Sequence, residues 1–515
     1  MRTGAPVRAQ GPGIAARTLE QRSKPGRRAW SFPELDVPRA EPSPEHRRAG
    51  DSALPRVAEV DVIRHFTALA QRNYGIDTGF YPLGSCSMKY NPKVAETVAA
   101  LPGFQRLHPH QPEDSIQGAL ELLWRLERAL CDLTGMARAT FQPPAGAGGE
   151  LTGLLIMRAF HEKESGTPRT KVVIPDSAHG TNPASVTSAG YKVVQVPSDS
   201  RGLVDLGQLE KLVDEDVAGL MLTNPNTLGL FEVEIQGIAA ALHRVGALLY
   251  YDGANLNAIM GRVRPGDMGF DIVHMNTHKT FATPHGGGGP GAGPVAVARR
   301  LERFLPSPVV GFDEEAGRYF WDRDRPDSIG HVHGFHGNFG VLVRAFAYVF
   351  GHGRDGLRAA GERAVLNANY LASKVRESYP MAFDGRPMHE FVSTAKPPRR
   401  HGVRAMDVAK RLIDHGFHPS TVYFPLIVEE AMMVEPTETE TKETLDAFAE
   451  AMLDVAREAA EDPDRLHEAP MTTPVRRLDE AKAARELRLS WAMHPDRSSR
   501  KDAGDPSEAG EHPTI

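Results

Sequence analysis

The sequence predicts an α/β fold, in which a large domain with a mostly parallel sheet is followed by a smaller C-terminal α/β domain. Three observations lead to this prediction. Short β-branched runs alternate with helical patterns between residues 171 and 298. Such alternation is typical of βαβ units whose sheet is covered on both faces. The pattern changes after about residue 325, and small or polar residues follow several of the predicted strands.

The composition is that of an ordinary globular protein. The 515-residue chain is 41% hydrophobic and 24% charged, with a net charge of −6 at pH 7. This charge gives no field that would attract nucleic acid, and no run of about 18 apolar residues predicts a membrane span. Two cysteines, Cys86 and Cys131, suit a reducing compartment. We therefore expect a cytoplasmic protein that binds neither nucleic acid nor membrane.

Both ends of the chain are predicted to lie outside the core. Residues 1–58 form an N-terminal arm whose first part is expected to be disordered. Its first 29 residues hold six arginines and one acid, Glu20, without the apolar stretch of a secretory signal. An organellar transit peptide and a basic disordered arm are the two alternatives. Residues 496–515 are rich in Ser, Asp, Glu, Gly and Pro and are expected to form a disordered tail.

The large domain is predicted over residues 59–325. Apolar residues at helical spacing indicate helices at 59–73 and 113–134, with a proline-containing loop at 81–92 between them. The alternating series that follows predicts strands at 171–174, 192–196, 219–222, 247–251 and 294–298, and helices at 206–213 and 235–245.

The small domain is predicted over residues 326–495. Strands are expected at 388–392 and 423–427, on either side of a helix at 405–415. A capping box from Thr437 to Glu440 is expected to open a helix that runs to about residue 460.

Four segments of the large domain carry residues suited to chemistry. The first is FQPPAGAGGE, residues 141–150. Its Gly146, Gly148 and Gly149 precede an apolar helix expected to begin at Leu151. Small residues there let backbone N–H groups approach an anion such as phosphate. A plain turn is the alternative.

The second and third segments place His179 and Asp252 after predicted strands. His179 lies in DSAHGTNPAS, in the kind of loop where such sheets bind ligands, although a surface histidine is the alternative. Asp252 ends a buried apolar strand, where a carboxylate is costly unless a positive or protonated group meets it. A pyridinium nitrogen and a metal ion are two such groups. Because no second carboxylate is evident nearby, we favour the pyridinium; a helix cap is the alternative.

The fourth segment, MNTHKTFATPHGGGGPGAG, contains Lys279 after a strand that ends near His274. A lysine at a strand end, beside polar residues and glycines, suits Schiff-base chemistry. Asp252 on one strand end and Lys279 on a later one is an arrangement by which many pyridoxal 5′-phosphate (PLP) enzymes hold the cofactor ring. The glycines follow Lys279 and open no βαβ unit, so we reject a dinucleotide site. The order of the four segments is that of a type I PLP fold.

Several long segments also resemble one family. They include YPLGSCSMKYNP, AHGTNPAS, YDGANLNAI, NTHKTFATPHGGGGPG and GFHPSTVYFPLIVEEAMMVEPTETETKETLDAF. From about Arg22 to Trp491 the chain is similar to glycine dehydrogenase (decarboxylating) subunit 2, the β subunit of the split P-protein of the glycine cleavage system. The resemblance implies that Lys279 bonds to PLP, Asp252 faces the pyridine nitrogen and His179 stacks on the ring.

The resemblance implies further contacts around the cofactor. Gly146 and Ala147 are placed at the phosphate, with Thr277 as a weaker candidate. Ser85, Ser87 and Lys89 are placed beside the substrate pocket without assigned roles. Gly148 departs from the family, where His or Gln is usual, so a side-chain contact is absent or replaced there. His331 and His333, in HVHGFH, are interpreted as a solvated loop, and no metal site is expected.

The function implied by the resemblance is PLP-dependent decarboxylation of glycine by an aminomethyl-transferring oxidoreductase. The aminomethyl group passes to the lipoyl arm of the H-protein, and glycine dehydrogenase subunit 1 is the partner in an α2β2 heterotetramer. Two alternatives stay open. One is another type I PLP enzyme, such as an aminotransferase or a desulfurase with Cys86 as its nucleophile. The other is a non-catalytic partner subunit.

Overall fold

The computed structural model describes residues 17–50, 52, 54–473, 475–487 and 489. Its contacts divide the chain into two units, Met1–Gly79 and Phe80–Ile515. The segments expected to be disordered, at the start of the arm and at 496–515, lie outside the described residues. Among the described residues, no helix is both long and apolar enough to cross a lipid bilayer.

The first unit holds helices α1 (Leu19–Arg22) and α2 (Glu59–Ala70). The second of these confirms the helix predicted from residue 59. Arg27 pairs with Asp61 of α2 at 2.9 Å. The apolar side chains of α2 are nevertheless uncovered: Val60, Ile63 and Phe66 are 48%, 59% and 56% exposed. Within the described part of the first unit, no apolar partner covers this side of the amphipathic helix.

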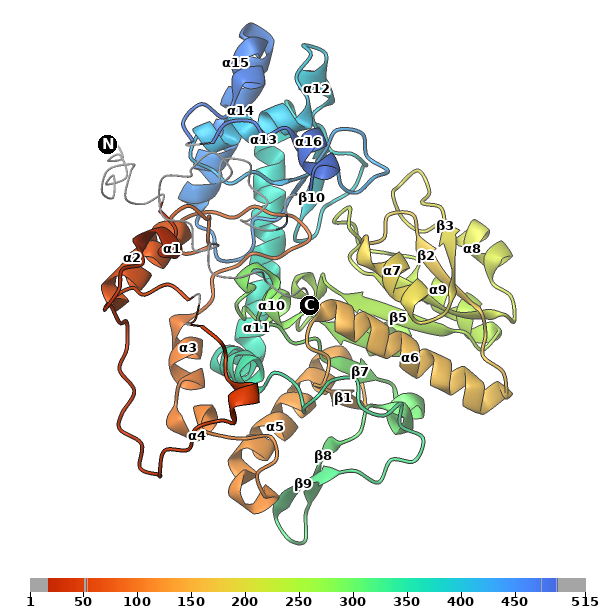
Figure 1. Ribbon diagram of the computed structural model, residues 1–515. Coiled ribbons are helices and arrows are strands. Elements are labelled where there is room, and N and C mark those ends of the chain that lie inside the picture. The colour runs from red at the N-terminus through yellow and green to blue at the C-terminus, as the bar shows by residue number, and fades with distance from the viewer. Residues whose placement is uncertain (1–16, 51, 53, 474, 488, 490–515) are drawn as a thin grey trace. The chain divides into compact units, whose positions relative to one another are not determined.

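The second unit is built on a seven-stranded sheet (Figure 1). Its strands are β1 (Arg138–Thr140), β2 (Lys171–Pro175), β3 (Lys192–Val196), β4 (Val217–Thr223), β5 (Leu248–Gly253), β6 (Ile272–Met275) and β7 (Val295–Val297). They lie in the order β1-β7-β6-β5-β4-β2-β3. Only β7 runs against the others, pairing antiparallel with both β1 and β6. The mostly parallel sheet is thus confirmed, and the strand predicted at 294–298 is the reversed one.

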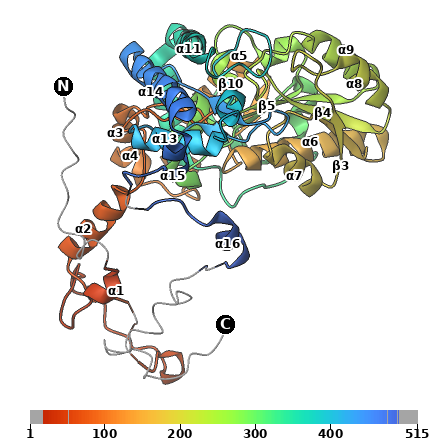
Figure 2. The same ribbon diagram turned by 90° about the horizontal axis from the view of Figure 1, so that it is seen from above.

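Helices cover both faces of this sheet, as Figure 2 shows. One face packs against α5 (Gln117–Thr134), α8 (Leu206–Leu212) and α9 (Ile235–Arg244), and the other against α6 (Gly146–Ser165) and α7 (Thr181–Ser188). Side chains alternate along β5: Leu249 and Tyr251 join the first core, and Leu248 and Tyr250 join the second. The helices predicted at 113–134, 206–213 and 235–245 are confirmed.

The start of α6 differs from the sequence expectation. The helix begins at Gly146 and not at Leu151, so the glycines form its first turn instead of a loop before it. Glycine is a poor helix former, which is why the pattern placed the boundary later. The segment predicted to bind an anion is therefore the N-terminal end of a helix.

A helix of 37 residues, α11 (Phe339–Val375), was not predicted. Four glycines between residues 351 and 361 interrupt its sequence pattern, and Gly353 breaks the helical backbone with φ 62°. Leu342 packs in the core of the large sheet, whereas Leu371 and Val375 pack in a second core further along the chain. The helix thus links the two cores.

The second core lies around a three-stranded antiparallel sheet of β10 (Phe391–Thr394), β11 (Thr421–Val422) and β12 (Ala431–Val434). It is covered by α13 (Ala405–Asp414) and α14 (Lys442–Glu461). Besides short 3-10 helices, the structure has α3 (Lys93–Ala99), α4 (Pro102–Gln105), α10 (Thr277–Thr280), α12 (Lys396–Arg399), α15 (Pro463–Glu468), α16 (Glu480–Arg485) and an unpredicted hairpin of β8 (Val309–Asp313) and β9 (Arg318–Asp322).

Two predictions for this region are wrong. The strand expected at 423–427 is a loop, because Tyr423 has φ 59° and Pro425 has no N–H to give to a ladder; the strand that pairs there is β12. Helix α14 begins at Lys442, after Thr441, whose hydroxyl caps it by accepting from the N–H of Thr444. Thr437 does not cap this helix, because it lies four residues before the N-cap Thr441 and has φ 59°.

Candidate active site

Asp252 lies near the carboxyl end of β5 and is 2% exposed. Its Oδ1 accepts from the N–H of Ala254 at 3.0 Å and lies 3.1 Å from Nε2 of His274. Its Oδ2 accepts from Nδ2 of Asn182 at 3.0 Å. Burial alone would raise the pKa of this carboxyl, but His274, Asn182 and Lys279 hold it well below its usual range. Asp252 is therefore ionised, and Oδ2 keeps room for one more donor.

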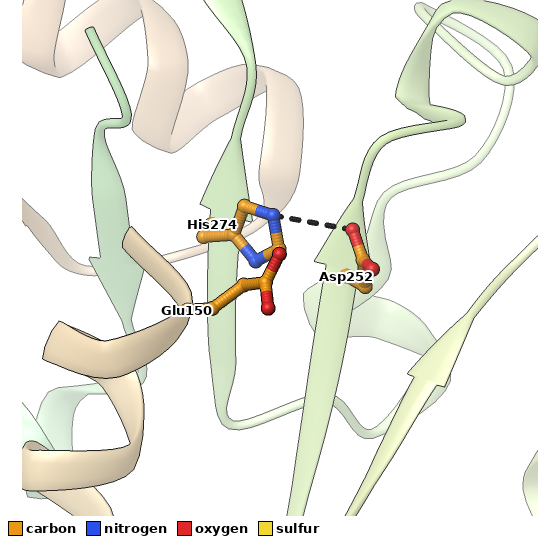
Figure 3. Close-up of side chains that lie close together, drawn as sticks. All are labelled: Glu150, Asp252 and His274. Atoms are coloured by element: carbon orange, nitrogen blue, oxygen red, sulfur yellow. Dashed lines mark ion pairs between the residues drawn. The ribbon is translucent and has the colours of Figure 1, made fainter. Parts of the chain in front are cut away.

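A second carboxylate lies close to Asp252, contrary to the sequence expectation. Atoms of Glu150 on α6, Asp252 and His274 on β6 lie within 4.8 Å of one another (Figure 3). The expectation failed because Glu150 comes from a helix far earlier in the chain. Its two oxygens accept from the hydroxyls of Thr181 at 2.8 Å and Ser185 at 2.7 Å. Glu150 thus anchors α7, the helix that carries Asn182.

Lys279 lies at the same sheet edge as this cluster, and the role assigned to it stays a prediction. It belongs to the single turn α10, which follows β6 almost directly, and is 7% exposed. Strands β5 and β6 are parallel neighbours with Asp252 opposite His274, so both strands deliver residues to the same edge of the sheet. The charge of Lys279 contributes to the lowered pKa of Asp252. The sheet topology therefore brings together two residues that are 27 positions apart.

The first turn of α6 presents backbone N–H groups that have no partner among the described residues. Its N-cap, Ala145, supplies no side-chain hydrogen bond. Gly149 N–H donates to the Ala145 carbonyl at 2.9 Å, whereas the three N–H groups before it have no partner within the helix. A Cβ on Gly146 would overlap Oδ1 of Asn276, so any larger residue would require the Asn276 side chain to move. This end of the helix suits an anion.

His179 lies in the turn between β2 and α7 and is partly exposed. Its Nδ1 is 3.0 Å from the hydroxyl of Thr181, and the ring of Phe424 meets it edge-on with the ring centres 5.9 Å apart. Burial and the charge of Lys279 lower the pKa of this imidazole, with Asp252 opposing them. The ring is therefore neutral at neutral pH and lies within the electrostatic reach of Lys279 and Asp252.

Thr277 is fully buried on α10. Its hydroxyl donates to the carbonyl of Ala292 at 3.1 Å and accepts from the hydroxyl of Thr283 at 3.1 Å. The bond to Ala292 uses the single donor of this hydroxyl. Among the predicted phosphate contacts it has the weakest geometric support, and its role stays a prediction.

The loop at 81–92 is held by buried acids. Ser85 and Ser87 have φ 64° and 42°, and their N–H groups donate to Glu390 at 2.7 Å and Glu435 at 2.9 Å. These hydrogen bonds stabilise a backbone shape that non-glycine residues rarely adopt. Both serines are therefore held in place by their backbone N–H groups.

Lys89 uses all three of its ammonium donors inside the protein. They go to Glu438 at 2.8 Å, Asn257 at 2.9 Å and Tyr348 at 3.1 Å. Lys89 therefore fixes this loop to the rest of the site and has no donor left for a substrate.

Sequence reasoning missed several of these residues: Glu150, Asn182, His274, Glu390 and Glu435. Two signals were present. His274 interrupts an otherwise apolar strand, and Glu435 directly follows the apolar run AMMV. A polar side chain in such a run requires a partner, but the sequence does not show which one. His331, by contrast, is exposed, and His333 is partly exposed.

The sheet with one reversed strand, the N–H groups at the start of α6, and Asp252 and Lys279 at one sheet edge have the arrangement of the PLP-dependent fold type I. Among solved structures, the chain is similar to a glycine decarboxylase (P-protein) of the glycine cleavage system in inhibitor-bound form. The TM-score is 0.65, at 23% sequence identity, and the likeness covers 82% of this chain and 92% of that chain. At this identity the likeness concerns the fold.

Sequence relatives identify the family. The model for the glycine cleavage system P-protein matches residues 34–319, and that for the glycine dehydrogenase C-terminal domain matches residues 360–472. Proteins named "Probable glycine dehydrogenase (decarboxylating) subunit 2" are similar in two organisms. The one from Caldanaerobacter subterraneus is 58% identical over 91% of this chain and 97% of its own. The one from Listeria monocytogenes is 57% identical over 92% and 97%. The chain belongs to the glycine dehydrogenase (decarboxylating) subunit 2 family, which confirms the resemblance.

Proposed function

We propose that this chain is the catalytic, PLP-binding subunit of a two-chain glycine decarboxylase. It removes carbon dioxide from glycine and passes the aminomethyl group to the lipoyl arm of the glycine cleavage H-protein. The observation that carries the proposal is the juxtaposition of ionised Asp252 and buried Lys279 at one sheet edge. Membership of the family supports glycine as the substrate.

The residues present fit PLP. The free N–H groups of Gly146 and Ala147 suit its phosphate, and the open position on Asp252 Oδ2 suits its ring N–H. Lys279 supplies the amine that bonds to its aldehyde carbon. Among the described residues, two buried atoms nearby lack a hydrogen-bond partner, Oδ1 of Asn276 and Oγ1 of Thr280. When bound, PLP supplies an electron sink for the pair left by departing carbon dioxide.

Each side chain has a separate task. Asp252, fixed by His274, Asn182 and the Ala254 N–H, keeps the cofactor's ring nitrogen protonated. Neutral His179 packs against the ring of the bound cofactor. The bond between the α-carbon and the carboxylate of glycine must stand perpendicular to the plane of the cofactor ring before it breaks. The main contribution of the protein is therefore to orient the bound glycine. Lys279 gives way to the glycine amino group and later returns.

The catalytic cysteine of a desulfurase has no good counterpart here. Such a residue must be accessible and easily ionised. Burial raises the pKa of the Cys86 thiol; Lys279 opposes this rise, whereas Glu435 and Glu390 add to it. The neighbouring Ser85 and Ser87 are held by hydrogen bonds. A decarboxylase is therefore favoured over this alternative.

The partners that we propose are glycine dehydrogenase subunit 1, the lipoylated H-protein and glycine. The relatives are named as second subunits, which supports a separate first subunit and an α2β2 assembly. The exposed apolar residues of α2 support a partner chain over the arm, because large apolar side chains at that spacing are usually covered.

The test is to purify this chain with its first subunit and record the visible absorbance. Glycine-dependent exchange of labelled carbon dioxide is then measured with lipoylated H-protein. We expect a visible cofactor band and exchange that requires glycine, this chain and the carrier. A complex that binds no PLP, or that exchanges carbon dioxide equally well without glycine, contradicts the proposal.

A further inference from the structure

Two fully buried carboxyl groups lie together under the loop at 81–92. Glu390 comes directly before β10, and Glu435 comes directly after β12. Antiparallel pairing sets Phe391 opposite Val434, which brings the two glutamates to the same end of the small sheet. Atoms of Glu390, Glu435 and His389 lie within 4.8 Å of one another.

Neutral donors surround these carboxyls. Glu390 accepts from the N–H of Ser85 at 2.7 Å and from Asn255 at 3.2 Å. Glu435 accepts from both the N–H and the hydroxyl of Ser87. Among the described residues, neither glutamate forms a salt bridge with a lysine or arginine. The pair therefore lacks a salt bridge that would offset the cost of ionising both carboxyls in a buried site.

His389 faces the pair but does not balance its charge. The side chain is fully buried, and neither ring nitrogen has a hydrogen-bond partner among the described residues. Its Nε2 lies 3.8 Å from Oε1 of Glu435 and 4.0 Å from Oε1 of Glu390. Burial lowers the pKa of His389 to about 3, so the ring is neutral at neutral pH. An uncharged imidazole beside two carboxyls is suited to relaying a proton.

The surrounding charges favour a single proton on the pair. Burial and the neighbouring Glu435 raise the pKa of Glu390 well above its usual value, and Lys279 opposes them. Burial raises the pKa of Glu435 to about 7, with Ser87 and Lys279 opposing and Glu438 adding to the rise.

The other titratable groups that face the cluster are Cys86 from the loop at 81–92 and Lys89, which is paired with Glu438. Two carboxyls so close to each other in a buried site do not both ionise.

We propose that Glu390 and Glu435 hold one proton between them and act as the acid–base pair of this site. They take a proton from the amino group of incoming glycine and return one to Lys279. This inference rests on the proposed function. Asp252 is unsuited to the role because it is ionised and held by three partners, and it is reserved for the ring nitrogen.

In this step, each proton that the pair takes up is matched by one that it gives back. Glycine enters as an ammonium ion and needs a free electron pair on nitrogen before it can replace Lys279. One N–H bond of glycine breaks as an O–H bond forms on the pair. An O–H bond of the pair then breaks as an N–H bond forms on the displaced lysine amine. No oxidant or reductant is required.

A proton explains the cluster better than a metal ion does. Each of the four carboxyl oxygens already accepts a hydrogen bond, from Ser85, Ser87 or Asn255. Lys279 also lies near enough to lower the pKa of both groups, and its charge would repel a cation. A metal that co-purifies in stoichiometric amount and is lost in Glu435→Gln would overturn the proposal.

The first test is infrared titration of the full two-subunit complex with its cofactor. A protonated carboxyl has a C=O band that ionisation removes. We expect this band to disappear at lower pH in Glu390→Gln and in Glu435→Gln than in the unaltered complex, because each substitution removes the like-charged neighbour. The matched control is Glu440→Gln, which removes a partly buried glutamate outside the cluster whose pKa burial raises to about 6. A band that disappears at the same pH in both test variants as in the unaltered complex would contradict the proposal of a shared proton.

The second test is rapid mixing with glycine, followed by the absorbance change of the bound cofactor. Glu435→Gln should slow this change on the order of 10²-fold or more, which is the usual contribution of a positioned acid–base group. Glu440→Gln should match the unaltered complex. An unaltered complex that gives no response to glycine overturns the proposed function as well. A normal response with Glu435→Gln at full speed overturns only the role of the pair.

Discussion

At the scale of single residues, Asp252 is the most constrained group of the site. Its charge is met by one histidine and two N–H donors, and no lysine or arginine forms a salt bridge with it among the described residues. Because its folded pKa is depressed, its ionised form contributes stability above the ordinary Asp pKa of about 3.9. That contribution is lost only as the pH falls through the acid range, so the group is charged at neutral pH.

Asp252→Asn should keep the cofactor bound but slow glycine decarboxylation by about 10²–10³-fold, because a neutral amide cannot hold the ring nitrogen protonated. The measurement is carbon dioxide exchange per bound cofactor. Asp271→Asn is the matched control: Asp271 is a buried carboxylate at the opposite end of β6, paired with Arg300 and His243. Near-normal exchange in Asp252→Asn would show that this aspartate is only structural.

Lys279→Ala should abolish the visible cofactor band and the activity while leaving the fold intact, since the lysine amine makes the covalent bond to PLP. Circular dichroism checks the fold, and borohydride reduction followed by peptide mapping locates the labelled lysine in the unaltered protein. Label on another lysine would contradict the assignment.

His179→Ala should weaken PLP retention by about 1 kcal/mol, the contribution of one ring stack, which corresponds to roughly a fivefold change in dissociation constant. Equilibrium dialysis of PLP measures it. Phe424→Leu is a useful comparison, because it removes the ring that meets His179 edge-on and leaves the histidine in place. Unchanged retention in His179→Ala would rule out stacking.

The sequence predicted those site residues whose position follows from strand ends. Asp252 and Lys279 follow neighbouring parallel strands, and parallel strands end at the same edge. The groups that set their electrostatics could not be predicted in this way. Glu150 and Asn182 reach the site from helices on another part of the sheet, and only the three-dimensional packing shows that they meet.

At the scale of elements, Lys89 joins three parts of the second unit. It lies in the loop at 81–92, contacts Tyr348 of α11 and forms an ion pair with Glu438 beyond β12. The pair is nearly fully buried, with side chains 1% and 9% exposed. Because the folded pKa of Glu438 is lowered by Lys89 against the effect of burial, this stabilisation is present at neutral pH and lost as the pH falls.

Lys89→Met should lower the free energy of unfolding by about 3–5 kcal/mol, since it leaves Glu438 buried and unpaired. Chemical denaturation at neutral pH measures the loss. The double variant Lys89→Met/Glu438→Gln should recover part of it, because the remaining group is neutral. The difference between Lys89→Met and the unaltered protein should shrink at acidic pH. A loss that is the same at every pH would contradict the buried charge pair.

Element boundaries were predicted where local pattern decides them and missed where distant contacts do. Strand β3 matches its prediction, whereas α11 was not predicted because glycines interrupt its period. The strand expected at 423–427 had suitable residues, but the backbone turns at Tyr423 and Pro425, and the ladder is formed by β12 instead.

At the scale of the whole molecule, the chain contains one unit with its own core and one without. The unit from Phe80 onward holds the sheets and the candidate site, whereas the unit that ends at Gly79 exposes the apolar side of α2. The division of the chain into domains at 59–325 and 326–495 stays a prediction. The unit that ends at Gly79 suits a segment that is ordered by a partner chain.

Deleting residues 1–58 should therefore lower assembly with the first subunit more than it lowers PLP binding. Sedimentation gives the assembly state, and absorbance gives the cofactor content of the same samples. An isolated monomer with full activity would contradict both this expectation and the α2β2 assembly.

The ion pair of Lys89 and Glu438 joins positions that are 349 residues apart, and this has a consequence for heredity. A substitution at one of these positions alters the selection that acts on the other. The segments YPLGSCSMKY and VEPTET, which contain them, should therefore change together in evolution. Chimeras that take both segments from one relative should be more stable than those that mix parents with unlike pairs. Lineages that replaced one residue should carry a compensating replacement of its partner.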